Sequence, residues 1–170
     1  DPLISRALSP AMTIHDTYQA IIATPLGRIG IRMAGAAVSE LDYLPADALE
    51  QSPADAATAE VVGQLEAYFF NPRHPFTMPL APAGTAFQQR VWEALRNIPP
   101  GTALTYGELA RQLDTAARAV GGACRNNPLP ILIPCHRVVG RQGLGGYAGA
   151  VTGDPLGIKR WLLRHEGALP

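Results

Sequence analysis

The stretch NPLPILIPCHRVVG, residues 127–140, decides how this 170-residue chain is interpreted. An apolar run, Leu129–Ile133, lies between prolines and is followed directly by Pro134, Cys135, His136 and Arg137. Such a run predicts a short buried segment that presents the cysteine at its end. A thiol becomes a nucleophile when a cation, a base or a helix N-terminus lowers its pKa. The cysteine is therefore the first candidate for chemistry.

A cysteine beside a histidine supports more than one interpretation, because most buried cysteines only fill space in a core. Neighbours in an extended segment point to opposite faces. A contact between Cys135 and His136 therefore needs a kink, which Pro134 would help to set, or a bridging water. Glu166 follows the last predicted helix, and its carboxylate would complete a relay of cysteine, water, histidine and glutamate.

The composition is that of a globular protein, with 47% hydrophobic and 16% charged residues. No apolar stretch reaches the roughly 18 residues of a membrane span. The given N-terminal residues lack a basic region followed by an apolar core, so we expect no secretory signal. Residues 1–11, ahead of Met12, are expected to be a tag or a disordered extension. The two cysteines are too few for a disulfide framework or a four-thiolate zinc site. We therefore expect a cytoplasmic protein with no metal and no cofactor.

A formal net charge of zero conceals an uneven distribution of charge along the chain. Residues 1–81 carry 4 Arg and 9 acidic residues, whereas residues 82–170 carry 9 Arg, one Lys and 5 acidic residues. A basic second half predicts a polyanionic partner for that half alone. Solvated surface charge would produce the same imbalance.

The first half is predicted to be a small sheet with one helix. The expected elements are strands at Tyr18–Ala23, Arg28–Met33 and Val38–Leu44, a hairpin turn at Thr24–Gly27, and an amphipathic helix at Ala54–Phe70 that Pro72 ends. The proline-rich residues 71–84 predict a boundary. We expect an N-terminal α/β domain over residues 12–80 and a C-terminal domain over residues 81–170, which together make an α+β protein.

The second half is predicted to be mainly helical. The expected elements are helices at Thr85–Asn97, Tyr106–Leu113, Ala116–Arg125 and Leu156–Arg164, and a glycine-rich loop at Arg141–Gly157. The two middle helices, separated by a tight turn, match a helix-turn-helix. Gly121 and Gly122 each lower the stability of the helix predicted at Ala116–Arg125 by about 1 kcal/mol relative to Ala. Close packing between helices and close approach to a nucleic-acid backbone would each explain them.

The motif around the cysteine resembles the 6-O-alkylguanine-DNA alkyltransferase family of bacterial type, also called methylated-DNA–protein-cysteine S-methyltransferases. Further matches occur in the same order at Thr85, Phe87, Gln88, Val91, Trp92, Tyr106, residues 117–121, Gly146, Tyr147, Lys159, residues 161–163 and residues 165–167. The resemblance covers nearly all of residues 82–167 and is weaker over residues 18–76. It implies an RNase H-like N-terminal domain, with an antiparallel sheet and a helix, and a C-terminal DNA-binding domain.

The resemblance also implies an activity, which is repair of DNA by direct reversal. Cys135 would accept the alkyl group of 6-O-alkylguanine irreversibly, once per molecule, with 4-O-alkylthymine as a further substrate. His136 would act as the base through a water, and Glu166 would orient its imidazole. Asn127 would link the helix-turn-helix to the cysteine loop. Tyr106 would give a proton to the guanine ring.

Double-stranded DNA with an alkylated guanine is the implied partner, bound in the minor groove with little sequence specificity. A monomer would flip the damaged base out of the DNA stack, and Arg118 would fill the space that the base leaves. Cooperative binding of several molecules along DNA is a further expectation. The implied DNA-binding residues are Tyr106, Ala117, Arg118, Ala119, Gly121 and Arg125. The implied substrate pocket comprises Pro134, Val138, Tyr147, Ala148 and Lys159.

Three departures from the family's pattern bear on these expectations. The N-terminal half has no Cys/His cluster, so the structural zinc of some relatives is not expected. The segment Tyr147–Lys159 is longer than in the family, which leaves the preference among alkyl groups open. Ala148 stands where some relatives carry Ser, which removes a hydrogen bond to the guanine oxygen.

Two other classes of function compete with repair. A non-catalytic, lesion-binding helix-turn-helix protein is one, but the related binding-only group carries Trp in place of the reactive cysteine, and this chain keeps Cys135. A cysteine hydrolase is the other, but it does not place its Cys and His next to each other. Cys124 matches no motif and is expected to be a packed bystander.

Overall fold

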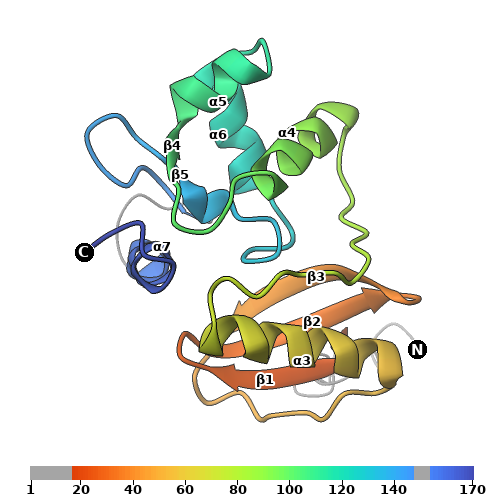
Figure 1. Cartoon of the computed structure of the whole chain (residues 1–170). Coiled ribbons are helices and arrows are strands. Elements are labelled where there is room, and N and C mark those ends of the chain that lie inside the picture. The colour runs from red at the N-terminus through yellow and green to blue at the C-terminus, as the bar shows by residue number, and fades with distance from the viewer. Residues whose placement is uncertain (1–16, 148–153) are drawn as a thin grey trace, which may run out of the picture.

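The computed structural model describes residues 17–147 and 154–170 and has an α+β architecture, as predicted (Figure 1). Its N-terminal half contains the strands β1 (Ala20–Thr24), β2 (Gly27–Ala34) and β3 (Ala37–Leu44) and the helix α3 (Ala56–Phe70). Its C-terminal half contains α4 (Ala86–Arg96), β4 (Leu104–Thr105), α5 (Tyr106–Gln112), α6 (Ala117–Arg125), the 3₁₀ turn η1 (Cys135–Arg137), β5 (Val138–Val139) and α7 (Asp154–His165). The predicted residues 1–11, Met12 and Ala148 lie outside the described residues.

The three N-terminal strands form an antiparallel sheet in the order β1-β2-β3. Thr24 pairs with Gly27, so the hairpin turns on Pro25 and Leu26, as predicted. Gly27 takes a φ of +99°, in the left-handed region that favours glycine. The strand prediction is confirmed within two residues, although β1 begins at Ala20 and not at Tyr18.

Helix α3 covers one face of this sheet (Figure 1). The Asp55 side chain caps its first turn by accepting a hydrogen bond from Thr58 N at 2.8 Å. Leu65 and Tyr68 are buried in the same cluster as Ile29 and Ile31 of the sheet. The apolar face of α3 therefore forms the core of the N-terminal half, as its periodicity predicts.

In the C-terminal half, the helices predicted between residues 85 and 125 form within two residues of the expected bounds. Thr85 and Thr105 begin α4 and α5 with complete capping boxes, closed by Gln88 and Glu108. The buried Trp92 of α4 donates a hydrogen bond from Nε1 to the Ala123 carbonyl of α6 at 2.9 Å. No helix within residues 17–147 and 154–170 combines the length and the apolar character that a membrane span needs.

The structure refines the prediction at two places. Residues Cys135–Arg137 form a 3₁₀ turn after Pro134, which agrees with the kink that the sequence left open and not with a fully extended segment, and the following β5 pairs in parallel with β4. Helix α7 begins at Asp154, so the last residues of the predicted loop belong to the helix. The reason lies in Pro155, because a proline is well tolerated in the first turn of a helix.

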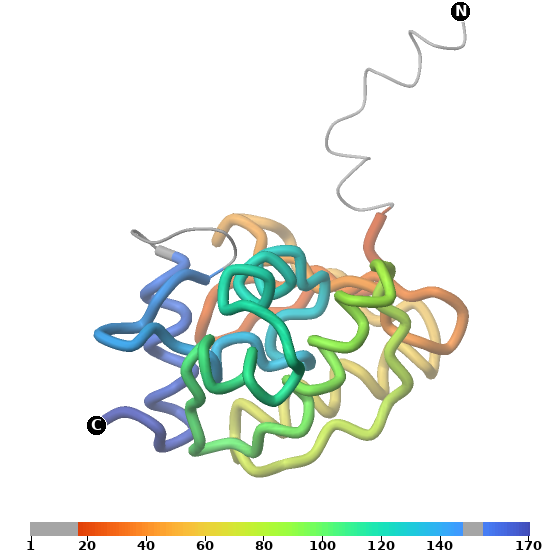
Figure 2. Tube along the Cα trace, turned by 90° about the horizontal axis from the view of Figure 1, so that it is seen from above, coloured from red at the N-terminus to blue at the C-terminus, as the bar shows by residue number. Residues whose placement is uncertain are grey.

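Contacts between the two halves involve both backbone and aromatic rings. Leu41 N of β3 donates to the Pro128 carbonyl at 2.9 Å. The rings of Phe69 and Trp161 lie 5.8 Å apart, and those of Tyr68 and His165 lie 5.2 Å apart, so the end of α3 packs on α7. Figure 2 shows α7 at one side of the molecule and the turn between β2 and β3 at the other. Residues far apart in the sequence therefore meet beside the cysteine loop.

Candidate active site

Asn127 holds the backbone of the cysteine loop in place. Its side-chain Nδ2 donates to the Ile133 carbonyl at 2.8 Å, and its Oδ1 accepts from Leu129 N at 2.9 Å. Asn127 lies two residues after α6 ends, so these bonds link that helix to the loop. Inside the loop the buried Ile131 takes a φ of +76°, which is strained for a β-branched residue. Close packing around Ile131 holds this conformation.

The Cys135 thiol lies at the wall of a cavity of about 510 Å³ and is only 6% exposed. Tyr43, Cys124, Asn127 and Tyr147 line the same cavity. Burial raises the pKa of the Cys135 thiol, although the Asn127 amide and the Lys159 ammonium act in the opposite direction. The thiol is therefore protonated at neutral pH and needs a base before it can act as a nucleophile.

His136 and Glu166 form a buried pair, with His136 Nε2 and Glu166 Oε2 2.7 Å apart. Burial lowers the pKa of His136, although Glu166 acts in the opposite direction, so the ring is a neutral base. Burial alone would raise the pKa of Glu166, but hydrogen bonds from His136 and Arg137 outweigh it and lower that pKa to about 2. An ionised carboxylate only accepts, so Nε2 carries the hydrogen. The lone pair of the ring is then on Nδ1, which is buried and has no hydrogen-bond partner among the described residues.

Two side chains around Glu166 were not predicted as site residues. The Arg137 guanidinium donates two hydrogen bonds to the carboxylate, from Nε to Oε1 at 2.8 Å and from Nη2 to Oε2 at 2.9 Å. Tyr68 of α3 donates from its hydroxyl to Oε2 at 2.6 Å. The sequence did contain a signal for Arg137, because it lies beside an apolar run and is therefore expected to be buried. Buried arginines are almost always paired with an acidic group. No local pattern marks Tyr68.

Tyr106 and Lys159 lie next to each other, with the Lys159 Nζ 5.6 Å from the centre of the Tyr106 ring. Burial is the main cause that raises the pKa of the Tyr106 hydroxyl to about 12, so it keeps its proton at neutral pH. Lys159 is fully buried, and its Nζ donates to the Val138 and Gly146 carbonyls at 2.7 and 2.8 Å. Burial lowers the pKa of Lys159 to about 8. These bonds tie α7 to β5 and to the residues before Tyr147.

Of the described residues predicted for the pocket, Tyr147 lines the cavity that contains Cys135. Pro134 lines a different cavity, of about 260 Å³, together with Tyr68 and Arg137. Val138 and Lys159 are fully buried behind the cysteine turn and are not among the residues that line the Cys135 cavity. The structure therefore brings Cys135, Asn127 and Tyr147 together at one cavity and places Pro134 on another.

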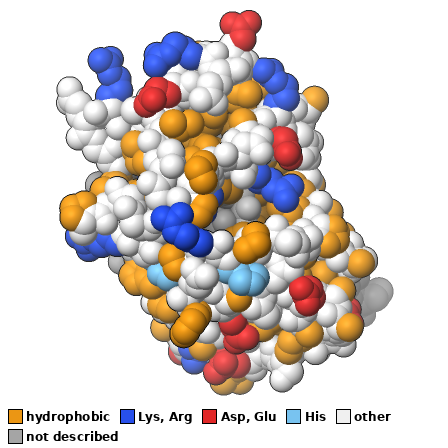
Figure 3. Space-filling model, viewed as in Figure 1, with side chains coloured by type: hydrophobic (Ala, Val, Ile, Leu, Met, Phe, Trp, Pro, Cys, Tyr) orange, Lys and Arg blue, Asp and Glu red, His pale blue; other side chains and the backbone are white. Residues whose placement is uncertain are grey.

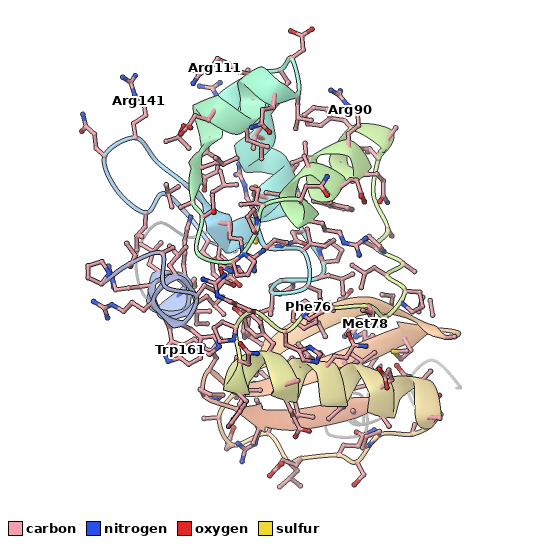
Figure 4. All side chains as sticks on the ribbon, in the orientation of Figure 1. Phe76, Met78, Arg90, Arg111, Arg141 and Trp161 are labelled. Atoms are coloured by element: carbon pink, nitrogen blue, oxygen red, sulfur yellow. The ribbon has the colours of Figure 1, made fainter. Side chains whose placement is uncertain are left out.

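The residues predicted to bind DNA lie along α6 and at the start of α5. Ala117, Arg118 and Arg125 are exposed, whereas Ala119, Gly121 and Tyr106 are half-buried. Arg125 and Cys124 at the end of α6 reach the wall of the Cys135 cavity. Figure 3 shows basic side chains around the C-terminal half, and Figure 4 shows Arg111 and Arg141 pointing away from it.

The glycines of α6 are not explained by packing inside the chain. A Cβ atom placed at Gly121 or Gly122 would meet no atom within 4 Å beyond the helix itself. Of the two explanations that the sequence left open, close packing between helices therefore lacks support. Packing within the described part of the chain therefore does not require glycine at either position.

Within the described residues, no group of three or more His, Cys, Asp or Glu side chains is placed to hold a metal ion. Cys124 and Cys135 are both free thiols.

Comparison with known proteins agrees with this geometry. The sequence model of the "6-O-methylguanine DNA methyltransferase, DNA binding domain" matches residues 86–168. A methylated-DNA–protein-cysteine methyltransferase of Methanosarcina barkeri is 41% identical over 157 residues, which cover 88% of this chain and 96% of that protein. The corresponding protein of Shigella flexneri is 54% identical over 96 residues, so the match spans about half (53%) of that relative's length.

Solved structures show the same similarity. The crystal structure of the O6-methylguanine methyltransferase of Mycobacterium tuberculosis has a TM-score of 0.74 and 37% identity, and the match covers 87% of this chain and 91% of that one. A structure titled as the same organism's OGT in complex with DNA has a TM-score of 0.72 and 36% identity over the same shares of the two chains. The chain belongs to the methylated-DNA–protein-cysteine methyltransferase family.

Proposed function

We propose that this protein repairs DNA directly, by moving the alkyl group of 6-O-alkylguanine to the sulfur of Cys135, once per molecule and without a cofactor. The observation that carries the proposal is the His136–Glu166 pair. It leaves a buried, neutral ring nitrogen in the same turn as a buried thiol that needs a base. Residues 81–170 would carry the reaction, residues 12–80 would form a separate supporting domain, and the free thiols fit a reducing cytoplasm.

The proposed reaction begins with the thiol proton, which passes through a water to His136 Nδ1. The sulfur lone pair then forms a bond to the alkyl carbon while the bond from that carbon to the guanine oxygen breaks. The electron pair of the broken bond goes to the guanine, and Tyr106 supplies the proton that makes the leaving group neutral. The proton on His136 returns to Tyr106 through solvent, so the net products are guanine and an S-alkyl cysteine.

Glu166 takes part in this sequence without touching the substrate. Its carboxylate accepts a hydrogen bond from His136 Nε2, with 2.7 Å between Nε2 and Oε2. It would also stabilise the imidazolium that forms when Nδ1 takes the proton. Arg137 and Tyr68 hold the carboxylate in turn. The sulfur–carbon bond is not hydrolysed afterwards, and this explains why one molecule would act once.

Double-stranded DNA is the proposed partner, with α6 lying in the minor groove. Such a close approach needs a smooth helix face. Helix α6 has one, because there is open space beside Gly121 and Gly122 and because Ala117 is exposed. Arg118 is exposed near the start of α6 and would fill the stack after the guanine is flipped out. Readout in the minor groove is degenerate, so a monomer would bind with little sequence preference.

Incubation with duplex DNA that carries a radiolabelled 6-O-methylguanine tests the proposal. The wild-type protein should retain one label per molecule, and peptide mapping should place it on Cys135 and not on Cys124. Cys135→Ala should retain none, and label on that variant would refute the nucleophile. Tight binding without label would indicate a lesion-binding protein, and release of more than one equivalent would indicate a hydrolase.

A further inference from the structure

Two cavities share a wall at the junction of the two halves. The first contains Cys135. The second, of about 640 Å³, is lined by Leu26, Tyr43, Leu44, Pro45, Ala46, Tyr147, Pro155, Gly157, Ile158 and Trp161. Tyr43, Leu44 and Tyr147 line both cavities and therefore form the partition between them.

Two of the three partition residues are tyrosines from opposite halves of the chain. Tyr43 lies on β3, and Tyr147 lies within the predicted glycine-rich loop. Their hydroxyl oxygens are 2.8 Å apart, within hydrogen-bonding distance, and their rings are tilted with centroids 6.3 Å apart. Tyr147 is buried and Tyr43 is half-buried, so both rings fill space beside the thiol.

The second cavity differs chemically from the first. Among the described residues, the side chains on its wall are apolar apart from the two tyrosines, from Leu26 in the β1–β2 turn to Trp161 in α7. The Cys135 cavity includes the polar Asn127, Glu40 and Asp42 on its wall. A methyl group on a guanine oxygen needs little room beyond the sulfur, whereas an aryl substituent needs an apolar space of this kind.

We infer that Tyr43, held by Tyr147, is a specificity-determining residue that limits the size of the alkyl group that reaches the Cys135 sulfur. The inference rests on the proposed alkyl transfer and extends it to the N-terminal half, because the matched family domain covers residues 86–168 and excludes Tyr43. Removal of the Tyr43 ring joins the two cavities and opens an apolar space for a bulky substituent. Removal of its hydroxyl alone releases Tyr147 but leaves the ring in place.

Single-turnover rates on duplex DNA with 6-O-methylguanine and with 6-O-benzylguanine test this inference. For Tyr43→Ala, we expect the ratio of the benzyl rate to the methyl rate to rise about tenfold or more over the wild type. Tyr43→Phe should give a smaller rise in the same direction. Leu26→Trp added to Tyr43→Ala refills the second cavity and should return the ratio toward the wild-type value. Phe70→Ala, which truncates an aromatic side chain that is 93% exposed, should leave the ratio unchanged.

The outcomes separate this inference from the proposed function. A wild-type protein that takes up no methyl group would overturn the proposed function itself. A wild-type protein that takes up methyl, with an unchanged ratio in both Tyr43 variants, would overturn only the role of Tyr43. Equal loss of both rates would show that Tyr43 supports the fold and does not select the substrate. If Tyr43→Ala does not fold in a thermal scan, the ratio for Tyr43→Phe decides.

Discussion

Glu166 receives hydrogen bonds from side chains that come from separate parts of the chain. His136 and Arg137 belong to the cysteine turn, and Tyr68 belongs to α3. A buried carboxylate without such partners would be protonated or would destabilise the fold. The same bonds that would fix the imidazole in the proposed reaction therefore stabilise the folded state, and the proposal links activity to stability at a single residue.

The low pKa of Glu166 predicts how the stability of the protein depends on acid. Its pKa falls from an ordinary 4.5 to about 2 on folding, so its contribution is complete above pH 4.5 and is lost as pH falls toward 2. A shift of this size corresponds to about 3 kcal/mol. Glu166→Gln should lower the free energy of unfolding at pH 7 by about 3–5 kcal/mol, because it leaves the Arg137 charge buried without its partner.

Urea unfolding of both proteins at several values between pH 2 and pH 7 provides the measurement. The decline in stability between pH 4.5 and pH 2 should be steeper for the wild type than for Glu166→Gln. Glu93→Gln is the matched control, since Glu93 forms an exposed pair with Arg96 at 3.8 Å and should change stability by less than about 1 kcal/mol. Parallel pH profiles for the wild type and Glu166→Gln would contradict the assignment.

Arg118 carries the second prediction at the scale of a single residue. Arg118→Ala should slow alkyl transfer from duplex DNA, because no side chain then fills the stack left by the flipped base. Reaction with free 6-O-alkylguanine base should be unchanged, since the base is already unstacked. The two rates are compared under single-turnover conditions. An equal loss on both substrates would place Arg118 in the pocket and not in flipping.

The proposed role of helix α6 in DNA binding implies a cost to the helix's own stability. Gly122→Ala should raise the free energy of unfolding by up to about 1 kcal/mol, because alanine is the better helix former and no atom within the chain blocks its Cβ. The same methyl group would hold α6 away from the DNA backbone and weaken binding to duplex DNA. Urea unfolding and a DNA titration at fixed salt measure the two effects.

Gly63→Ala in α3 is the matched control for that substitution. Gly63 is exposed and lies in a helix, and an alanine Cβ at this position would meet no atom within 4 Å beyond the helix itself, so the gain in stability should be similar. Binding to DNA should stay at the wild-type level, since α3 belongs to the sheet half. If Gly122→Ala binds DNA as tightly as the wild type, the glycines of α6 have some other origin.

At the scale of elements, the features that depend on local interactions were predicted well from the sequence, and those that depend on contacts between distant residues were not. Thr85 with Gln88, and Thr105 with Glu108, are local caps, and the helices that they begin were predicted within one or two residues. The 3₁₀ turn at Cys135 and the positive φ of Ile131 depend on Asn127 and on the surrounding core. The short pairing of β4 with β5 leaves no periodic pattern in the sequence.

At the scale of the whole molecule, the two halves meet where the chemistry is expected to take place. The sequence predicted Cys135, His136 and Glu166 by resemblance, but nothing in it indicated that Tyr43 and Tyr68 of the N-terminal half would reach them. Each tyrosine lies in a segment whose pattern explains only its own strand or helix. Contacts at such sequence separation depend on how α3 packs on α7 and how β3 packs on the cysteine loop and Tyr147, and this becomes visible only in three dimensions.

Tyr68→Phe tests whether the N-terminal half stabilises the site through one hydrogen bond. The substitution removes the donor that lies 2.6 Å from Glu166 Oε2 in a buried setting and should cost about 1.5–3 kcal/mol, because the acceptor is charged. Tyr18→Phe removes a bond of the same length to Asp42 and a longer one, of 3.3 Å, from Arg32, in a setting where the Asp42 carboxylate is partly exposed, and should cost less than about 1 kcal/mol. Urea unfolding at pH 7 compares the two, and equal losses would show that burial of Glu166 adds nothing to this contact between the halves.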